Sequence, residues 1–259
     1  MTEVPIRPAA TVMLVREGSS GPEVYLLRRV AQMAFAGGMT AFPGGGVDTR
    51  DAASMNWSGP DPSWWASKFG IDAVLAQRVV TAAVRELFEE TSVLLADVPA
   101  GTPGSDPAGR EAFRLRIADH QAGLDALVGA GKIRADVLRP WARWVTPPGQ
   151  PRRYDTFFLL ALLPGGASPL MLTSEADSGG WMRPRDALAA AARAEIAMMP
   201  PTVAMLNSLA AIGSAAAMLA ADRDIRTVEA RVVSAPGEPI RVRAGDDEFA
   251  ALGLPVSRS

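Results

Sequence analysis

Two short runs rich in β-branched and aliphatic residues lie near the start of the chain, "ATVMLVRE" at 10–17 and "EVYLLRR" at 23–29. The turn-forming segment "GSSGP" separates them, so the pattern predicts two strands joined by a turn. Strand patterns return at "WARWVTP" and "YDTFFLLALLP", and the late segment "VEARVVSAPGEPIRVRAG" is typical of a hairpin.

Helical patterns lie between and after these runs. The longest extends from about 72 to 96 without Pro or Gly, and a second helical arm is predicted at about 108–128. Pro184 and Asp186 favour a helix start, and the apolar run at 200–221 predicts one further helix.

The mixture of both patterns predicts an α+β fold in a single domain spanning 1–259. The segment "TRDAASMNWSGPDPSWWASKFG" carries turn signals and no sustained period. We therefore expect an insertion at about 49–70, with a short helix, and a helical arm at about 105–139. Trp57, Trp64 and Trp65 are expected either to anchor this insertion or to stack on a base.

Composition and charge narrow the classes of partner. The chain has 259 residues, is 48% apolar and carries a formal charge of -2, so it has no broad basic field for duplex nucleic acid. The N-terminus shows no export signal, and the longest apolar runs are too short to span a bilayer. We expect a cytoplasmic protein that binds no membrane.

The near absence of two residue types restricts the chemistry. With 0 Cys, the chain has no thiolate nucleophile, disulfide or Cys-ligated zinc. The 1 histidine, His120, lies in a polar helical stretch and is expected to be a solvated surface residue, not a catalytic base. Carboxylates and a hard metal ion remain as the chemical tools.

The segment "RELFEETS" crowds three acids onto the long predicted helix. At 100° per residue, Glu86, Glu89 and Glu90 share one face, and the opposite face is apolar, with Val80, Val84, Leu87, Phe88 and Thr91. A solvated acidic face is the simple explanation. Arg85 stands at i, i+4 from Glu89, however, and a divalent cation such as Mg²⁺ or Mn²⁺ would relieve the repulsion between the acids.

This segment resembles the signature of the Nudix hydrolases. Arg85, Glu86, Leu87, Glu89, Glu90 and Val93 match it, and Gly45 in "FPGGGVD" corresponds to its leading glycine. Three features depart from the signature. About twenty-six residues are inserted before the Arg, Asp51 stands where the first Glu is usual, and Ser92 replaces the closing glycine, which affects a helix end.

The resemblance implies a Nudix-like α/β/α sandwich with a mixed sheet and a hydrolase that cleaves a small-molecule nucleoside diphosphate derivative. It implies that Glu86, Glu89, Glu90 and the carbonyl of Gly45 hold Mg²⁺ or Mn²⁺, with Arg85 as their orienting cation. Gly45 is equally compatible with a tight turn alone. The cluster Arg85, Glu86, Glu89 and Glu90 is thus the candidate catalytic group.

The surrounding sequence resembles Nudix enzymes that act on coenzyme A. In "LLRRVAQMAFAGGMTAFPGG", the Leu-Leu-x-Arg and Pro-Gly-Gly elements match that branch. Arg29, Phe42 and Arg153 are therefore the substrate-binding candidates, although each Arg is equally compatible with a surface ion pair. A broad NADH, ADP-ribose or oxidised-nucleotide pyrophosphatase and a non-catalytic nucleotide-binding regulator are the alternatives.

One further acid is a candidate by its place in a loop. Glu175 in "LTSEADSGGWM" precedes Trp181 by six residues, and Nudix enzymes often place an acid shortly before a Trp-bearing strand. We expect Glu175 to be a general base or an additional ligand, with Asp177 as its competitor and a polar loop residue as the alternative. The sequence leaves the oligomeric state open and is compatible with a homodimer.

Overall fold

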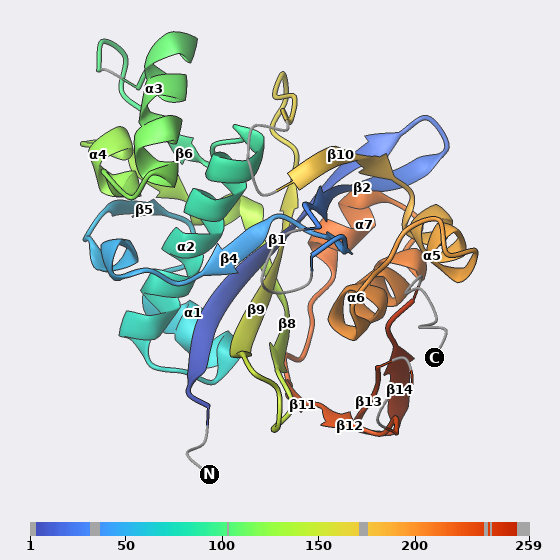
Figure 1. Ribbon diagram of the computed structural model, residues 1–259. Coiled ribbons are helices and arrows are strands. Elements are labelled where there is room, and N and C mark those ends of the chain that lie inside the picture. The colour runs from blue at the N-terminus through green and yellow to red at the C-terminus, as the bar shows by residue number, and fades with distance from the viewer. Residues whose placement is uncertain are drawn as a thin grey trace.

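A mixed eight-stranded sheet forms the centre of the protein (Figure 1). The computed structural model describes residues 4–31, 37–102, 104–170, 176–235, 238 and 240–252. Across the sheet lie β10 (Ala176–Met182), β2 (Gly21–Arg29), β1 (Ile6–Gly18), β9 (Arg153–Leu162), β8 (Leu138–Val145) and β11 (Thr227–Glu229). The short strands β3 (Thr40–Ala41) and β4 (Gly44–Gly46) pair with β2 and β1. The predicted hairpin of the first two strands is confirmed, with Val15 opposite Val24.

Helices cover both faces of the sheet (Figure 1). On one side are α1 (Pro62–Phe69) and α2 (Ala73–Thr91); on the other are α5 (Pro184–Ala192), α6 (Pro200–Ala210) and α7 (Ala215–Ala220). Side chains alternate along a strand, so Phe157 of β9 enters the core under α2 and Phe158 enters the core under α6. The expected α/β/α fold class is confirmed. No helix in the described part of the chain is long and apolar enough to cross a membrane.

The ends of the helices differ from the sequence prediction at two places. The Asp72 side chain caps α2 at the expected start, but the helix ends at Thr91 and not near 96, because Ser92 adopts a left-handed conformation with φ of 62°. The single helix predicted at 200–221 is wrong. It divides after Ala210, and Ser214 begins α7 by accepting a hydrogen bond from the backbone N–H of Ala217.

The insertion and the helical arm join in a second, small sheet. The insertion forms the 3-10 helix η1 (Thr49–Ala52), β5 (Asn56–Ser58) and α1, and the arm forms α3 (Pro107–Ala118), α4 (Leu124–Val128), β7 (Lys132–Arg134) and the 3-10 helix η2 (Ala135–Val137). Strand β7 pairs with β5 on one side and with β6 (Ala96–Asp97) on the other. The arm therefore has two helices, not the single one expected.

Tryptophans fix the insertion to the body of the protein. Trp65 is fully buried in the core under α2, and the indole N–H groups of Trp57 and Trp65 both donate to the carbonyl of Pro60, at 2.6 and 3.1 Å. This placement fits the anchoring interpretation for both residues. Trp64 is 36% exposed and packs edge-on against Trp65.

A third sheet of three strands ends the described chain. It contains β12 (Arg231–Val232), β13 (Arg241–Ala244) and β14 (Asp247–Ala250). Strands β12 and β13 pair antiparallel as the predicted hairpin requires, with Val232 opposite Val242. Val242 and Phe249 pack against the core under α6, where Phe249 meets the ring of Trp144.

Candidate active site

The glycines of β4 lie directly against the acidic face of α2. The backbone N–H of Gly44 donates to Oε2 of Glu90 at 2.9 Å. A Cβ atom at Gly45 would lie 2.6 Å from Oε1 of Glu86, and one at Gly44 would collide with the carbonyl oxygen of Ala10. Glycine is thus required here for close approach, and two of the predicted ligand carboxylates contact the same loop.

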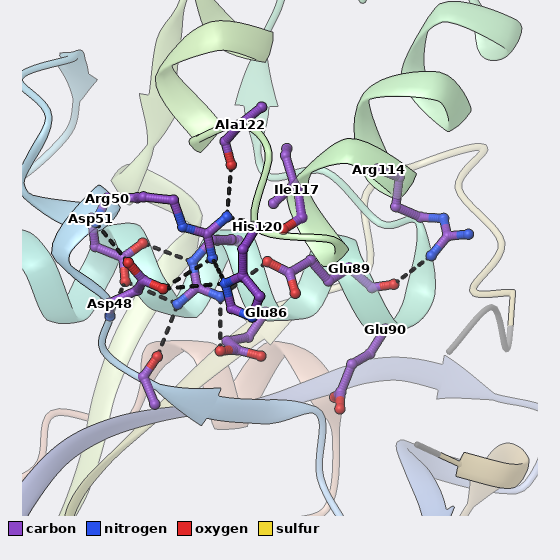
Figure 2. A network of polar contacts seen from close by, with 12 residues as sticks. Asp48, Arg50, Asp51, Glu86, Glu89, Glu90, Arg114, Ile117, His120 and Ala122 are labelled. Carbon is purple, nitrogen blue, oxygen red and sulfur yellow. Dashed lines mark hydrogen bonds and ion pairs between the residues drawn. The ribbon is translucent and has the colours of Figure 1, made fainter. Parts of the chain in front are cut away.

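Arg85 organises the acids from inside the protein, and Figure 2 shows three of its partners, Asp51, Glu86 and Glu89. Its guanidinium, 2% exposed, donates from Nε and Nη2 to the two carboxylate oxygens of Asp51 at 2.8 and 2.9 Å. From Nη1 it donates to Glu86 at 2.8 Å and to Glu89 at 3.0 Å, and from Nη2 also to the carbonyl of Gly46 at 2.9 Å. The i, i+4 contact with Glu89 that the sequence suggested is present.

The charge balance around Arg85 keeps its guanidinium protonated. Burial alone would lower the pKa of Arg85, but the hydrogen bond to Asp51 and the charges of Glu86, Asp51 and Glu89 outweigh burial and raise the pKa above its ordinary value. A buried Arg with five donors used in this way is a rigid template for the surrounding carboxylates.

Asp51 is a site residue whose role the sequence analysis did not identify. Its carboxylate is 1% exposed, and it accepts from the backbone N–H of Asp48 at 2.7 Å as well as from Arg85. The signal was its position six residues after Gly45, the spacing of the first Glu in the Nudix signature. Asp51, which stands in place of the first Glu of the signature, is the buried partner of Arg85.

Glu86 and Glu90 are far less solvated than a surface acidic face would be. Burial raises the pKa of Glu86 to about 7, against the lowering effect of Arg85 and together with the repulsion from Glu89. Glu90 is 9% exposed as a residue. A partly desolvated carboxylate pair beside a backbone loop offers the hard oxygen donors that Mg²⁺ and Mn²⁺ prefer, so the residues fit such an ion.

The acids that the structure describes do not by themselves form a cluster of metal ligands. Among the described residues no group of three or more acidic or histidine side chains is arranged to hold a metal ion. Glu89, 15% exposed, is directed to Arg85. The ligand roles of Gly45, Glu86, Glu89 and Glu90 stay predictions.

A cavity of about 190 Å³ lies on the other face of the sheet, near the glycine loop. Its wall includes Ala41 of β3, three residues before Gly44. Because three residues span at most about 11 Å, this part of the wall lies no farther than that from Gly44. Its lining is mostly apolar, with Arg29, Met39, Trp144, Tyr154 and Pro200 among its residues. Arg29 is thus at a cavity that an organic group could enter.

The other two predicted substrate-binding residues are not among those that line this cavity. Phe42 is 5% exposed and packs in the core under α6. Arg153 is 7% exposed, and its Nε donates to the carbonyl of Thr146 at 3.2 Å. Substrate contacts by either residue stay predictions.

The remaining candidates lie at the edges of the site or outside the description. Glu175 falls in 171–175, outside the described residues. Its competitor Asp177 is on β10, with its side chain 45% exposed and 4.0 Å from Nε of Arg28. The His120 side chain is 72% exposed, as expected, although its Nδ1 lies 2.6 Å from Nη2 of Arg50.

Comparisons with known proteins define the class. No family model matches the chain. A Nudix hydrolase structure from Alicyclobacillus acidocaldarius is similar to it with a TM-score of 0.66 and 26% identity, covering 85% of this chain and 98% of that one. The α/β/α architecture, with an acidic helix against a glycine loop, is therefore that of a Nudix-fold protein.

Curated relatives agree with this class. The chain is 29% identical over 206 residues to the putative nudix hydrolase 7 of Caenorhabditis elegans, covering 80% of this chain and 61% of that protein. It is 26% identical over 235 residues to the human acyl-coenzyme A diphosphatase NUDT19, covering 76% and 62%. The chain is thus similar to Nudix hydrolases and resembles their coenzyme A diphosphatase branch. It spans less than two thirds of the length of these two relatives.

Proposed function

We propose that this protein is a metal-dependent diphosphatase that cleaves the diphosphate linkage of coenzyme A or an acyl-coenzyme A. The observation that carries the proposal is the cluster around Arg85, in which Glu86 and Glu90 lie against the glycine loop. Carboxylates held in this way are suited to bind a divalent ion that in turn binds a diphosphate.

Each residue has a defined task in this proposal. Glu86, Glu90 and the carbonyl of Gly45 would hold Mg²⁺ or Mn²⁺, which when bound neutralises phosphate charge and acidifies a water molecule. Arg85 holds Glu89 beside these ligands, where it contributes a further carboxylate. The attacking water's proton passes to a carboxylate, for which Glu175 and Glu89 are the candidates.

The choice of coenzyme A rests on two supports. One is the similarity of the Leu26, Leu27 and Arg29 segment to enzymes that act on coenzyme A; the other is the human relative named as an acyl-coenzyme A diphosphatase. Arg29 lines a largely apolar cavity close in the chain to the glycine loop, and such a cavity suits the organic part of a substrate.

The test is a hydrolysis screen with product masses. Coenzyme A, an acyl-coenzyme A, NADH, ADP-ribose and nucleoside triphosphates are each incubated with the protein and Mg²⁺ or Mn²⁺. We expect 4'-phosphopantetheine, or its acyl form, and 3',5'-ADP. Efficient turnover of NADH or ADP-ribose with coenzyme A untouched would replace this proposal by the broad pyrophosphatase. Binding of these nucleotides without any turnover would favour a regulator.

A further inference from the structure

Arg50 connects the segment that follows the glycine loop to the helical arm (Figure 2). It lies in η1, next to Asp51. Its Nη1 donates to the carbonyl of Ala122 at 2.7 Å and to that of Ile117 at 3.0 Å, where α3 ends, and its Nη2 donates to Asp48 at 3.0 Å. The hydrogen bond from Arg50 holds the pKa of Asp48 well below its ordinary value. One guanidinium thus joins two segments about seventy residues apart in sequence.

The same arm is also attached to the helix side of the site. Arg114 of α3 is 3% exposed, and its Nη1 donates to the backbone carbonyl of Glu89 at 3.0 Å. Its Nε and Nη2 donate to Glu111 at 2.8 and 2.7 Å, which fixes the guanidinium on the arm. Helix α3 therefore contacts α2 through Arg114 and η1 through Arg50.

The loop that contains η1 needs such attachments because the element is short. A 3-10 helix of 4 residues has little stability of its own, so contacts with neighbours set its position. Asp51 binds Arg85, Nη2 of Arg78 donates to the carbonyl of Asp48 at 3.2 Å, and Arg50 binds the arm. The first two contacts lead to α2, whereas Arg50 links η1 to the helical arm.

We propose that Arg50 is a positioning residue for the metal site, which uses the helical arm to hold η1, and with it Asp51 and the glycine loop, at a fixed place relative to the α2 carboxylates. The proposal rests on the metal site of the proposed function. It gives the arm a task in catalysis that does not require any arm residue to touch the substrate.

Arg50 also contacts His120, and the effect of this contact can be tested apart from that of the two carbonyl contacts. A guanidinium has no acceptor, so Nδ1 of His120 accepts from Arg50 and the ring proton of the neutral imidazole is on Nε2. Because this side chain is 72% exposed, its contact is solvated and contributes little to position. The positioning effect therefore belongs to the two carbonyl contacts.

The decisive measurement is Mn²⁺ binding, followed by the signal of free Mn²⁺ in electron paramagnetic resonance. Arg50→Ala is compared with Arg116→Ala, which removes the same charge from an exposed position on α3. Loss of a cation alone favours Mn²⁺ binding, whereas loss of positioning weakens it. We expect Kd for Arg50→Ala to exceed that for Arg116→Ala by about tenfold, as for other residues that support metal ligands. His120→Ala should bind Mn²⁺ like the wild type.

Turnover of whichever diphosphate the wild type cleaves gives a second readout. Arg50→Ala should lower kcat by about tenfold with KM little changed, because the positioned groups are the metal ligands and not the substrate cavity. Arg50→Lys keeps the charge without the forked geometry, and serves in place of the alanine variant if that variant does not fold; it should show the same direction of change in Kd.

Equal Kd values for the Arg50 and Arg116 variants would overturn the inference while leaving the proposed function intact. A wild-type protein that binds no Mn²⁺ would overturn the metal site itself, and this inference with it. The two failures are therefore distinguishable in one titration series.

Discussion

Replacing Asp51 by Asn should strongly destabilise the protein. Asp51 and Arg85 are 1% and 2% exposed, and two hydrogen bonds of 2.8 and 2.9 Å join them. An amide has one acceptor oxygen and carries N–H donors, so it would face the guanidinium with a donor. Removing one partner of a buried ion pair costs about 3–5 kcal/mol. Arg85 retains Glu86 and Glu89, so we expect a loss of about 3 kcal/mol, at the lower end of that range.

The free energy of unfolding is measured by urea denaturation at neutral pH, with Asp222→Asn as control. Asp222 also pairs with a cation, Lys68, at 2.9 Å, but its side chain is 89% exposed, and such solvated pairs contribute little to stability. For a chain of this size a loss of 3 kcal/mol corresponds to a fall in Tm of about 6–12 °C. If Asp51→Asn lowers the free energy of unfolding no more than Asp222→Asn does, Arg85 is not a template that depends on Asp51.

Three further predictions concern the site and the arm. Glu90→Gln should abolish divalent-metal-dependent turnover while circular dichroism shows the fold retained, because the amide oxygen can still accept from Gly44 but lacks the ligand charge; a fully active variant would contradict it. Gly45→Ala should weaken Mn²⁺ binding in the same titration, since its Cβ would meet the Glu86 carboxylate at 2.6 Å, and an unchanged Kd would refute this. Arg114 lowers the pKa of Glu111, so the pair stabilises the fold at pH values above the ordinary Glu pKa of 4.5, and this contribution is lost as pH falls through the lowered pKa. The stability gap between wild type and Glu111→Gln should therefore shrink in acid, and a gap that widens below pH 4 would contradict the assignment.

The sequence predicted what depends on local periodicity. The helical wheel placed Leu87 and Phe88 opposite the acids, and both are fully buried, because an apolar stripe at helical spacing must face a core. Periodicity alone extended α2 to about 96, whereas the signature resemblance placed a helix end at Ser92, where the left-handed conformation ends the helix. The break after Ala210 was missed because apolar residues continue through it and conceal the capping serine.

Contacts between distant segments were the part that no local pattern could predict. Arg85 is 34 residues from Asp51, and Arg50 is 67 and 72 residues from the carbonyls it binds. An Arg in a sequence is equally compatible with solvent and with such a partner, and the choice is made by how the insertion folds back on α2. The cavity beside Arg29 likewise forms from segments that meet only in the folded chain.

The three-stranded sheet of β5, β7 and β6 affects the order in which the chain folds. Strand β5 precedes α2 and β6 follows it, yet both pair with β7, so one strand closes the chain around the acidic helix. The pairing of Asn56 with Lys132 joins positions 76 residues apart, a loop closure that is slow to form, and we expect this sheet to assemble late in folding. A deletion of the arm would leave β5 and β6 without their common partner, so the structure of the insertion depends on the arm.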